Sequence, residues 1–169
     1  MLCQVLDRIN SAYHNKKYTM TATGHAVIGV VIAAAVSNPV LAIPLAVMSH
    51  VAADLFPHWD PGTNKDKKSY NQFFLGAVAD VLSSFAVTFL LIYFIFPQTS
   101  LLYAYIIVFA AQFFDWASAP YFLFKIKNPP IFYWFYKFQK LFDNKLDKPW
   151  GIIGQVVFLV GLVVFFKLF

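Results

Sequence analysis

Residues 20–60 read MTATGHAVIGVVIAAAVSNPVLAIPLAVMSHVAADLFPHWD, which is two apolar runs joined by a polar break at Ser37, Asn38 and Pro39. We place the runs at residues 20–36 and 40–56. Each is about 17 residues long, close to the minimum length of a membrane-spanning helix. The pair therefore predicts a helical hairpin that crosses a membrane twice, or a re-entrant hairpin that enters and leaves on one side.

The rest of the chain is equally apolar. Of its 169 residues, 60% are hydrophobic and 12% are charged, whereas soluble domains carry about 25% charged residues. Further apolar runs occupy residues 73–96, 101–123 and 150–169. The composition excludes an ordinary soluble domain and a disordered chain, and the single cysteine, Cys3, excludes a disulfide-stapled domain. We expect one all-α integral membrane domain over residues 1–169, with about five transmembrane helices.

Two segments have the pattern of helices that lie on a membrane surface. Apolar residues near the N-terminus recur at helical spacing: Leu2, Val5, Leu6 and Ile9. They do not form the apolar core of a cleaved signal peptide. Residues 129–144 place aromatic side chains on one helical stripe, with Lys137 and Lys140 on the other. Both segments therefore predict interfacial amphipathic helices.

The basic residues are distributed asymmetrically between the connections. With the runs spanning a membrane, all of them except Lys167 fall on one side, which the positive-inside rule makes cytoplasmic. We expect a multi-pass protein of a prokaryotic inner membrane, with its N-terminus in the cytoplasm and its C-terminus outside. Because the basic residues flank apolar runs, they favour membrane lipid and anionic lipid head groups as partners, and not nucleic acid.

Five ionisable residues lie inside the apolar runs: His25, His50, Asp54, Asp80 and Asp115. An ionisable group in a span costs about 3 kcal/mol or more, so it normally faces a partner, a water-filled cavity or an ion. His25 precedes Asn38 by about as many residues as His50 follows it, so an antiparallel hairpin brings the two imidazoles level. His50 and Asp54 are four residues apart and therefore share one helix face.

This set of side chains predicts a site for a divalent cation. Imidazole and carboxylate suit zinc, and iron or manganese tolerates the same ligands. We expect His25, His50, Asp54 and Asp80 to hold one or two ions.

Three further residues are candidates for catalysis. Asp115 would orient or deprotonate a water molecule. His58 and Asp60 would lie at the mouth of the site, after Pro57 ends the second helix.

Each candidate also has a plainer structural interpretation. The polar neighbours that would satisfy these groups are Thr21 for His25, Ser83 or Ser84 for Asp80, and Gln112 or Ser118 for Asp115. His58 and Asp60 would then only cap a helix and form a turn. The common depth of the five groups within the runs favours a joint site over these separate roles.

The segment SHVAAD at residues 49–54, together with Gly24 and His25, resembles the predicted membrane-bound metal-dependent hydrolases, a group of small bacterial and archaeal inner-membrane proteins. The His-x-x-x-Asp element is also similar to the ligand pair of zinc-dependent phospholipases C and P1-type nucleases. The resemblance implies that His50 and Asp54 are metal ligands and that His25 matches the early histidine of the family. The family's Pro-Asp-x-Asp-His element and its His-Arg-Gly-x-Thr-His-Ser loop are absent, and PHWD at residues 57–60 resembles a reduced counterpart.

The sequence predicts a membrane-embedded metal-dependent hydrolase that cleaves a phosphoester or ester of a lipid at the cytoplasmic leaflet. Two alternatives use the same residues differently. A cation or proton transporter or channel would bind its cargo at the His/Asp cluster. A non-catalytic membrane scaffold would use the buried polar groups only to fix the pairing of its helices.

Overall fold

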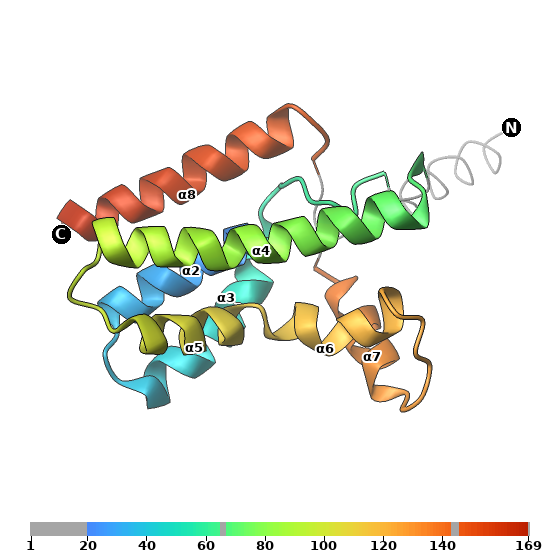
Figure 1. Ribbon diagram of the computed structural model, residues 1–169, viewed down its shortest axis with the longest axis horizontal. Helices are drawn as coiled ribbons and strands as arrows, with labels where there is room; N and C mark the ends of the chain where they lie inside the picture. Colours follow the sequence, from blue (N-terminus) through green and yellow to red (C-terminus); the bar gives the residue numbers. More distant parts are fainter. Residues whose placement is uncertain (1–19, 65–66, 143–145, 169) are drawn as a thin grey trace, which may run out of the picture.

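The computed structural model describes residues 20–64, 67–142 and 146–168, and every regular element within these ranges is an α-helix (Figure 1). The helices are α2 (Ala22–Ala35), α3 (Pro39–Leu55), α4 (Tyr70–Phe94), α5 (Leu101–Ala111), α6 (Phe113–Phe122), α7 (Ile131–Gln139) and α8 (Trp150–Leu168). The interfacial helix predicted at the N-terminus lies outside the described residues. The predicted all-helical fold class is confirmed for the described part of the chain.

Helix α2 is the centre of the molecule and packs against α3, α4, α5 and α8. Its residues from Gly24 to Ala33 are buried on every face, which is why the segment is apolar all round. Gly29 brings α2 unusually close to α5, because a Cβ atom at this position would lie 2.9 Å from the Cα atom of Val108. The core therefore forms around a short central helix that four other helices surround.

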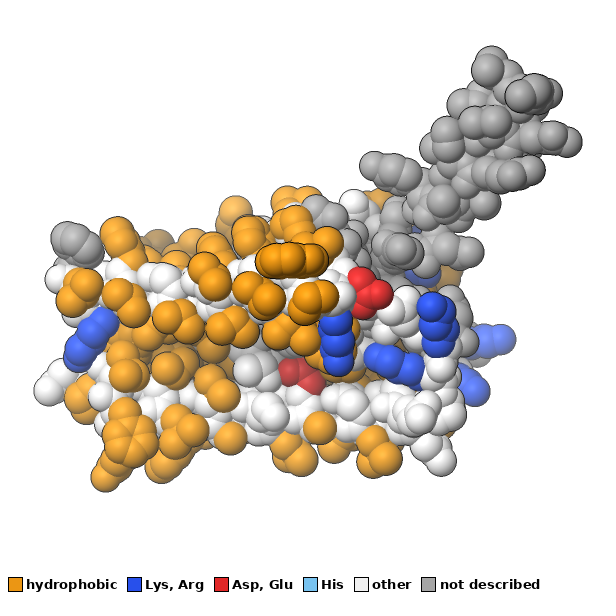
Figure 2. Space-filling view, turned by 90° about the horizontal axis from the view of Figure 1, so that it is seen from above, with side chains coloured by type: hydrophobic (Ala, Val, Ile, Leu, Met, Phe, Trp, Pro, Cys, Tyr) orange, Lys and Arg blue, Asp and Glu red, His pale blue; other side chains and the backbone are white. Residues whose placement is uncertain are grey.

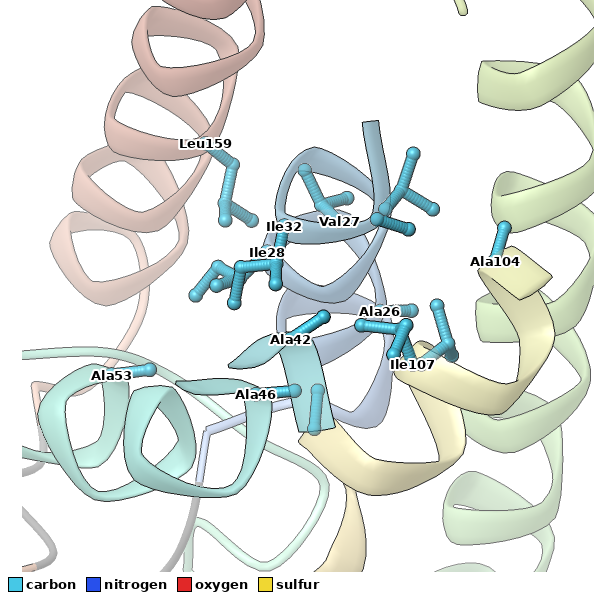
Figure 3. Packing of buried hydrophobic residues seen from close by; sticks show 14 of the residues in the cluster. Ala26, Val27, Ile28, Ile32, Ala42, Ala46, Ala53, Ala104, Ile107 and Leu159 are labelled. Atoms are coloured by element: carbon cyan, nitrogen blue, oxygen red, sulfur yellow. The ribbon is translucent and has the colours of Figure 1, made fainter. Parts of the chain in front are cut away.

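Helix α3 turns one narrow face towards this core. That face consists of Ala42, Ala46, His50, Ala53 and Asp54. Its alanines are small, and its two polar residues, His50 and Asp54, lie near the C-terminal end of the helix. Figure 3 shows the three alanines beside the aliphatic residues of α2 and α5. The other faces of α3 are apolar and exposed, a pattern that suits contact with lipid.

Two helices, α4 with 25 residues and α8 with 19, are long and apolar enough to cross a membrane. The pair α5 and α6 would form a third span, bent by 54°. Helices α2 and α3 are apolar but contain only 14 and 17 residues, which corresponds to about 21 and 26 Å against a hydrocarbon core of about 30 Å. Two or three candidate spans are therefore present, and five full spans are not confirmed.

The bend between α5 and α6 interrupts the run that we placed at residues 101–123. It occurs at Gln112, where the backbone leaves the helical conformation. The carbonyl oxygen of the preceding residue, Ala111, accepts a hydrogen bond from the imidazole Nδ1 of His50, which belongs to α3. The bend directs α6 away from α4 and leaves a cavity between these two helices.

The segment predicted as an interfacial helix at residues 129–144 is only partly helical and only partly exposed. Helix α7 ends at Gln139, and Asn144 lies outside the described residues. Trp134 and Leu141 are exposed, but Gln139 and Phe142 are buried. The Phe142 side chain turns inward because its ring packs against aromatic rings of α6 and α7.

Most of the described lysines gather at one end of the molecule, and the long faces of the bundle are hydrophobic (Figure 2). Lys68 and Lys148 at this end both lie over the ring of Trp59, at 5.8 and 4.2 Å from its centroid. Lys167 lies in the last turn of α8, at the other end, and donates a hydrogen bond to the carbonyl oxygen of Ile95 at 2.8 Å. The described chain thus has the charge asymmetry that its sequence predicts.

Candidate metal centre

The α2–α3 hairpin brings His25, His50 and Asp54 together in the interior. Their potential ligand atoms all lie within 4.8 Å of one another, and the three side chains are buried. Asp54 Oδ1 lies 3.2 Å from His25 Nε2, and Asp54 Oδ2 lies 3.3 Å from His50 Nε2. The two imidazole rings are stacked, with centroids 3.9 Å apart and planes at 8°. One carboxylate therefore faces two imidazoles at the same depth.

The short contacts in this cluster are not good hydrogen bonds. Within the described ranges, neither His25 Nε2 nor Asp54 Oδ2 has a hydrogen-bond partner, and neither does His25 Nδ1. Asp54 Oδ1 has one, since it accepts from the backbone N–H of Met20 at 2.6 Å. Buried polar atoms are nearly always satisfied, so the unpaired atoms of His25 and Asp54 need a physical explanation.

His50 is held in a defined orientation by a backbone group. Its Nδ1 atom donates a hydrogen bond to the carbonyl oxygen of Ala111 at 2.8 Å. Because a carbonyl only accepts, the proton of a neutral imidazole must be on Nδ1, and the lone pair of Nε2 then points towards Asp54. A hydrogen bond of this kind is the usual support of a histidine that binds a metal.

The charges in the cluster require a cation or a proton. Asp54 is fully buried, and its described ion-pair partners are His25 and His50. If both imidazoles were neutral, a buried carboxylate would be left without a countercharge, which costs several kcal/mol. If both were protonated, two stacked cations would repel at close range. A divalent ion, or one proton shared by the cluster, resolves this conflict.

Asp115 lies beside the cluster and not within it. Its Oδ1 atom is 3.9 Å from His50 Nε2 and accepts a hydrogen bond from Gln139 Nε2 at 3.0 Å. Gln139 Nε2 also lies 3.4 Å from His50 Nε2. The neighbours suggested by the sequence, Gln112 and Ser118, do not hold this carboxylate. Ser118 donates to the backbone of Asp115, and Gln112 donates to the carbonyl oxygen of Ala22.

Gln139 is the site residue that the sequence interpretation missed. It belongs to the segment assigned to the membrane surface, where a glutamine attracts little notice. It lies four residues after Phe135 and three before Phe142, so it falls on the aromatic stripe and not on the lysine side. A polar residue on the apolar stripe was the signal that could have identified it.

Asp80 occupies a different position from the other predicted ligands. Its Oδ2 accepts from the backbone N–H of Ala22 at 2.7 Å, and its Oδ1 accepts from the N–H and the hydroxyl of Thr23 at 3.1 and 2.8 Å. Both oxygens therefore bind the N-terminus of α2, where a negative charge also suits the helix dipole. The described cluster does not include Asp80, and we assign it the role of a cap supplied by α4.

His58 and Asp60 lie in the loop after α3, and both are buried. His58 Nδ1 donates to the carbonyl oxygen of Phe56 at 2.6 Å, and Asp60 Oδ1 accepts from the hydroxyl of Thr63 at 2.7 Å. These contacts organise a turn, which was the plainer interpretation. Asp60 also lines the cavity between α4 and α6, whereas neither residue belongs to the His25, His50 and Asp54 group.

No protein-family model, curated protein or solved structure matches the chain. The resemblance to membrane-bound metal-dependent hydrolases therefore stays a prediction that rests on the residues quoted for it. The described residues define a helical protein with two or three helices apolar enough to span a membrane and a buried group of two histidines and one aspartate.

Proposed function

We propose that the protein is a membrane-embedded metal-dependent hydrolase whose ion is held by His25, His50 and Asp54. The observation that carries this proposal is that one potential ligand atom from each of the three residues lies within 4.8 Å of the others. His25 Nε2 and His50 Nε2 lie 3.2 and 3.3 Å from different oxygens of the Asp54 carboxylate, so a single carboxylate group faces both imidazoles. Three protein ligands with one open position is the composition of a catalytic zinc site. Iron or manganese would accept the same set.

The residues around the three ligands suit hydrolysis. A bound divalent ion supplies Lewis-acid activation of a water molecule and of the substrate's oxygen. Asp115, beside His50, is the general base that takes a proton from the attacking water. Gln139 fixes the orientation of Asp115 through its 3.0 Å hydrogen bond. The cavity between α4 and α6 reaches Asp115 and Gln139 and offers space for a substrate.

The membrane placement supports a lipid ester or phosphoester as the substrate. Helices α4 and α8 supply candidate spans, and the exposed apolar faces of α3 suit lipid contact although the helix is short. We propose that α2 and α3 are also embedded, with the lysine-rich end in the cytoplasm. Their hairpin would then hold the cluster near the cytoplasmic leaflet.

Hydrolysis is favoured over transport because the buried face of α3 carries no polar side chain between His50 and the start of the helix. One turn from His50 along α3, the buried face becomes Ala46 and then Ala42, which are fully buried with Ile107. Figure 3 shows this part of the core filled by aliphatic side chains. A transported cation would need polar groups that continue through the membrane.

The test is elemental analysis of the protein purified without chelators. We expect about one zinc, iron or manganese ion per chain, a tenfold or greater loss in His50→Ala and Asp54→Asn, and full content in Ser49→Ala. Ser49 is a matched control, since it neighbours His50 but bonds to the carbonyl oxygen of Ala46. Wild-type protein that is metal-free and binds no added ion on titration would overturn the proposal, and metal uptake into liposomes would favour transport.

A further inference from the structure

The cavity between α4 and α6 has a volume of about 140 Å³ and a mainly apolar wall. Phe73 and Val81 of α4 and Trp116 and Phe122 of α6 line it. The start of α4 is joined to the end of α6 by a hydrogen bond, which the hydroxyl of Tyr70 donates to the carbonyl oxygen of Leu123 at 3.0 Å. A partly open space with this wall, between two candidate spans, suits a hydrocarbon chain.

The polar atoms of the cavity are mainly acceptors. Asp60, Asp80 and Asp115 contribute carboxylates, and Lys140 is the basic residue in the described lining. The Lys140 ammonium group lies over the ring of Tyr136, at 4.4 Å from its centroid. An anionic head group would therefore meet three like charges and one cation, a poor electrostatic match.

Gln112 gives an independent indication of the same preference. Its side chain is 1% exposed and lines the cavity. Its Nε2 atom donates to the carbonyl oxygen of Ala22 at 2.9 Å, which fixes the amide orientation because that carbonyl can only accept. The Oε1 atom then has no hydrogen-bond partner in the described part of the chain. A buried acceptor without a partner calls for a donor from a ligand or a water.

We infer that this cavity binds an amphiphile with one apolar chain and a head group that donates hydrogen bonds and carries no negative charge, such as a polyol or an amine. Gln112 Oε1 and the carboxylates of Asp60 and Asp115 accept from the head group, while the chain lies between α4 and α6. The indole N–H of Trp116, also without a described partner, remains to donate to the carbonyl oxygen of a bound ester. The binding preference follows from the cavity alone, and only the statement that the bound amphiphile is the substrate rests on the proposed function.

The test compares three amphiphiles with the same brominated undecyl chain and different head groups: glycerol, amine and phosphate. Binding to protein in phosphatidylcholine nanodiscs is followed by quenching of tryptophan fluorescence, after treatment with a chelator. We expect the glycerol or the amine compound to bind about tenfold more tightly than the phosphate compound. The glycerol and amine arms distinguish a polyol from an ammonium head group.

Matched variants locate the binding. Specific binding is the part of the fluorescence quenching that reaches a maximum as the compound is added. Ala77→Leu fills the cavity and should abolish this saturable quenching. Ala86→Leu, at an exposed position of the same helix, should leave it unchanged. Asp60→Asn should reduce the discrimination against phosphate. Equal or tighter binding of the phosphate compound, or binding that survives Ala77→Leu, would overturn the inference. Since chelator-treated protein is used, failure of the metal proposal would leave this preference intact, and the two failures are distinguishable.

Discussion

His50 Nδ1 and the carbonyl oxygen of Ala111 are joined by a 2.8 Å hydrogen bond that links α3 to the end of α5. The same bond lies at the point where α5 gives way to α6, so it serves the fold and the site together. It directs the other ring nitrogen of His50 towards Asp54 and Asp115. The bend between α5 and α6 and the orientation of a candidate ligand therefore meet at one contact.

The two roles of His50 can be separated by substitution. In His50→Asn, the amide nitrogen can take the place of Nδ1 and still donate to Ala111, but nothing replaces Nε2. In His50→Ala, the buried carbonyl of Ala111 also loses its partner, which costs about 1–3 kcal/mol. We expect both variants to lose the metal and His50→Asn to remain the more stable by about 1–2 kcal/mol, measured by thermal unfolding in detergent. Equal stabilities would show that the Ala111 contact contributes little.

Metal affinity should fall as the pH is lowered. An imidazole must be unprotonated to bind an ion, so each histidine that becomes protonated weakens binding by up to about tenfold per pH unit. Zinc titration against a fluorescent chelator between about pH 8 and about pH 5.5 measures this dependence. His25→Gln removes one of the titrating ligands and should make the dependence shallower. An affinity independent of pH would exclude the two imidazoles as ligands.

The sequence predicted the helical, apolar character of the fold but not the bend in the segment 101–123. Hydrophobic runs and polar breaks are local, so helix ends such as Leu55, before Pro57, can be read directly. The bend lies beside a contact between Ala111 and His50, which are distant in the sequence. The first run, at residues 20–36, was also placed longer than α2, because an apolar run does not show that Thr21 caps a helix that begins at Ala22.

The candidate site was predictable to the extent that one hairpin determines it. The spacing of His25 and His50 around Asn38 places them level, and the stacked rings are the result. The depth of Asp80 in its apolar run could not show that its carboxylate binds the N-terminus of α2, because side chains at the same depth in a bundle can face different helices. Gln139 was missed for the opposite reason, since it reaches the site from a helix assigned to the surface.

Asp80→Asn should reduce stability without removing the metal. The substitution removes a negative charge from the N-terminus of α2 and leaves one oxygen where two accepted hydrogen bonds. Losses of about 1–2 kcal/mol are typical of such a change. Ser83→Ala, at an exposed position on the same helix, is the control. Thermal unfolding and elemental analysis report the two properties, and loss of the ion at unchanged stability would restore Asp80 as a ligand.

Gln139→Leu should lower kcat for ester hydrolysis by about tenfold or more while the metal content stays at the wild-type level. The leucine removes the hydrogen bond that orients Asp115, so the pH profile of kcat should also change. Lys137→Leu is the control on α7, because Lys137 lies over the exposed ring of Trp134 and not in the site. A change in KM alone would indicate that Gln139 contacts the substrate and does not position Asp115.

Gly29→Ala tests whether the site depends on close packing of α2. A methyl group at position 29 would lie 2.9 Å from the Cα atom of Val108, and backbone cannot move as easily as a side-chain tip. Overpacking of this kind costs about 1–3 kcal/mol, and the separation of α2 from α5 would also pull His25 from His50, which is bonded to Ala111. We therefore expect lower thermal stability together with weaker metal binding. Gly154→Ala is the matched control, since a Cβ atom there meets no atom within 4 Å, so the substitution should not lower the thermal stability and should leave the metal affinity unchanged. If Gly29→Ala destabilised the protein but left the metal affinity unchanged, the position of His25 would not depend on the α2–α5 contact.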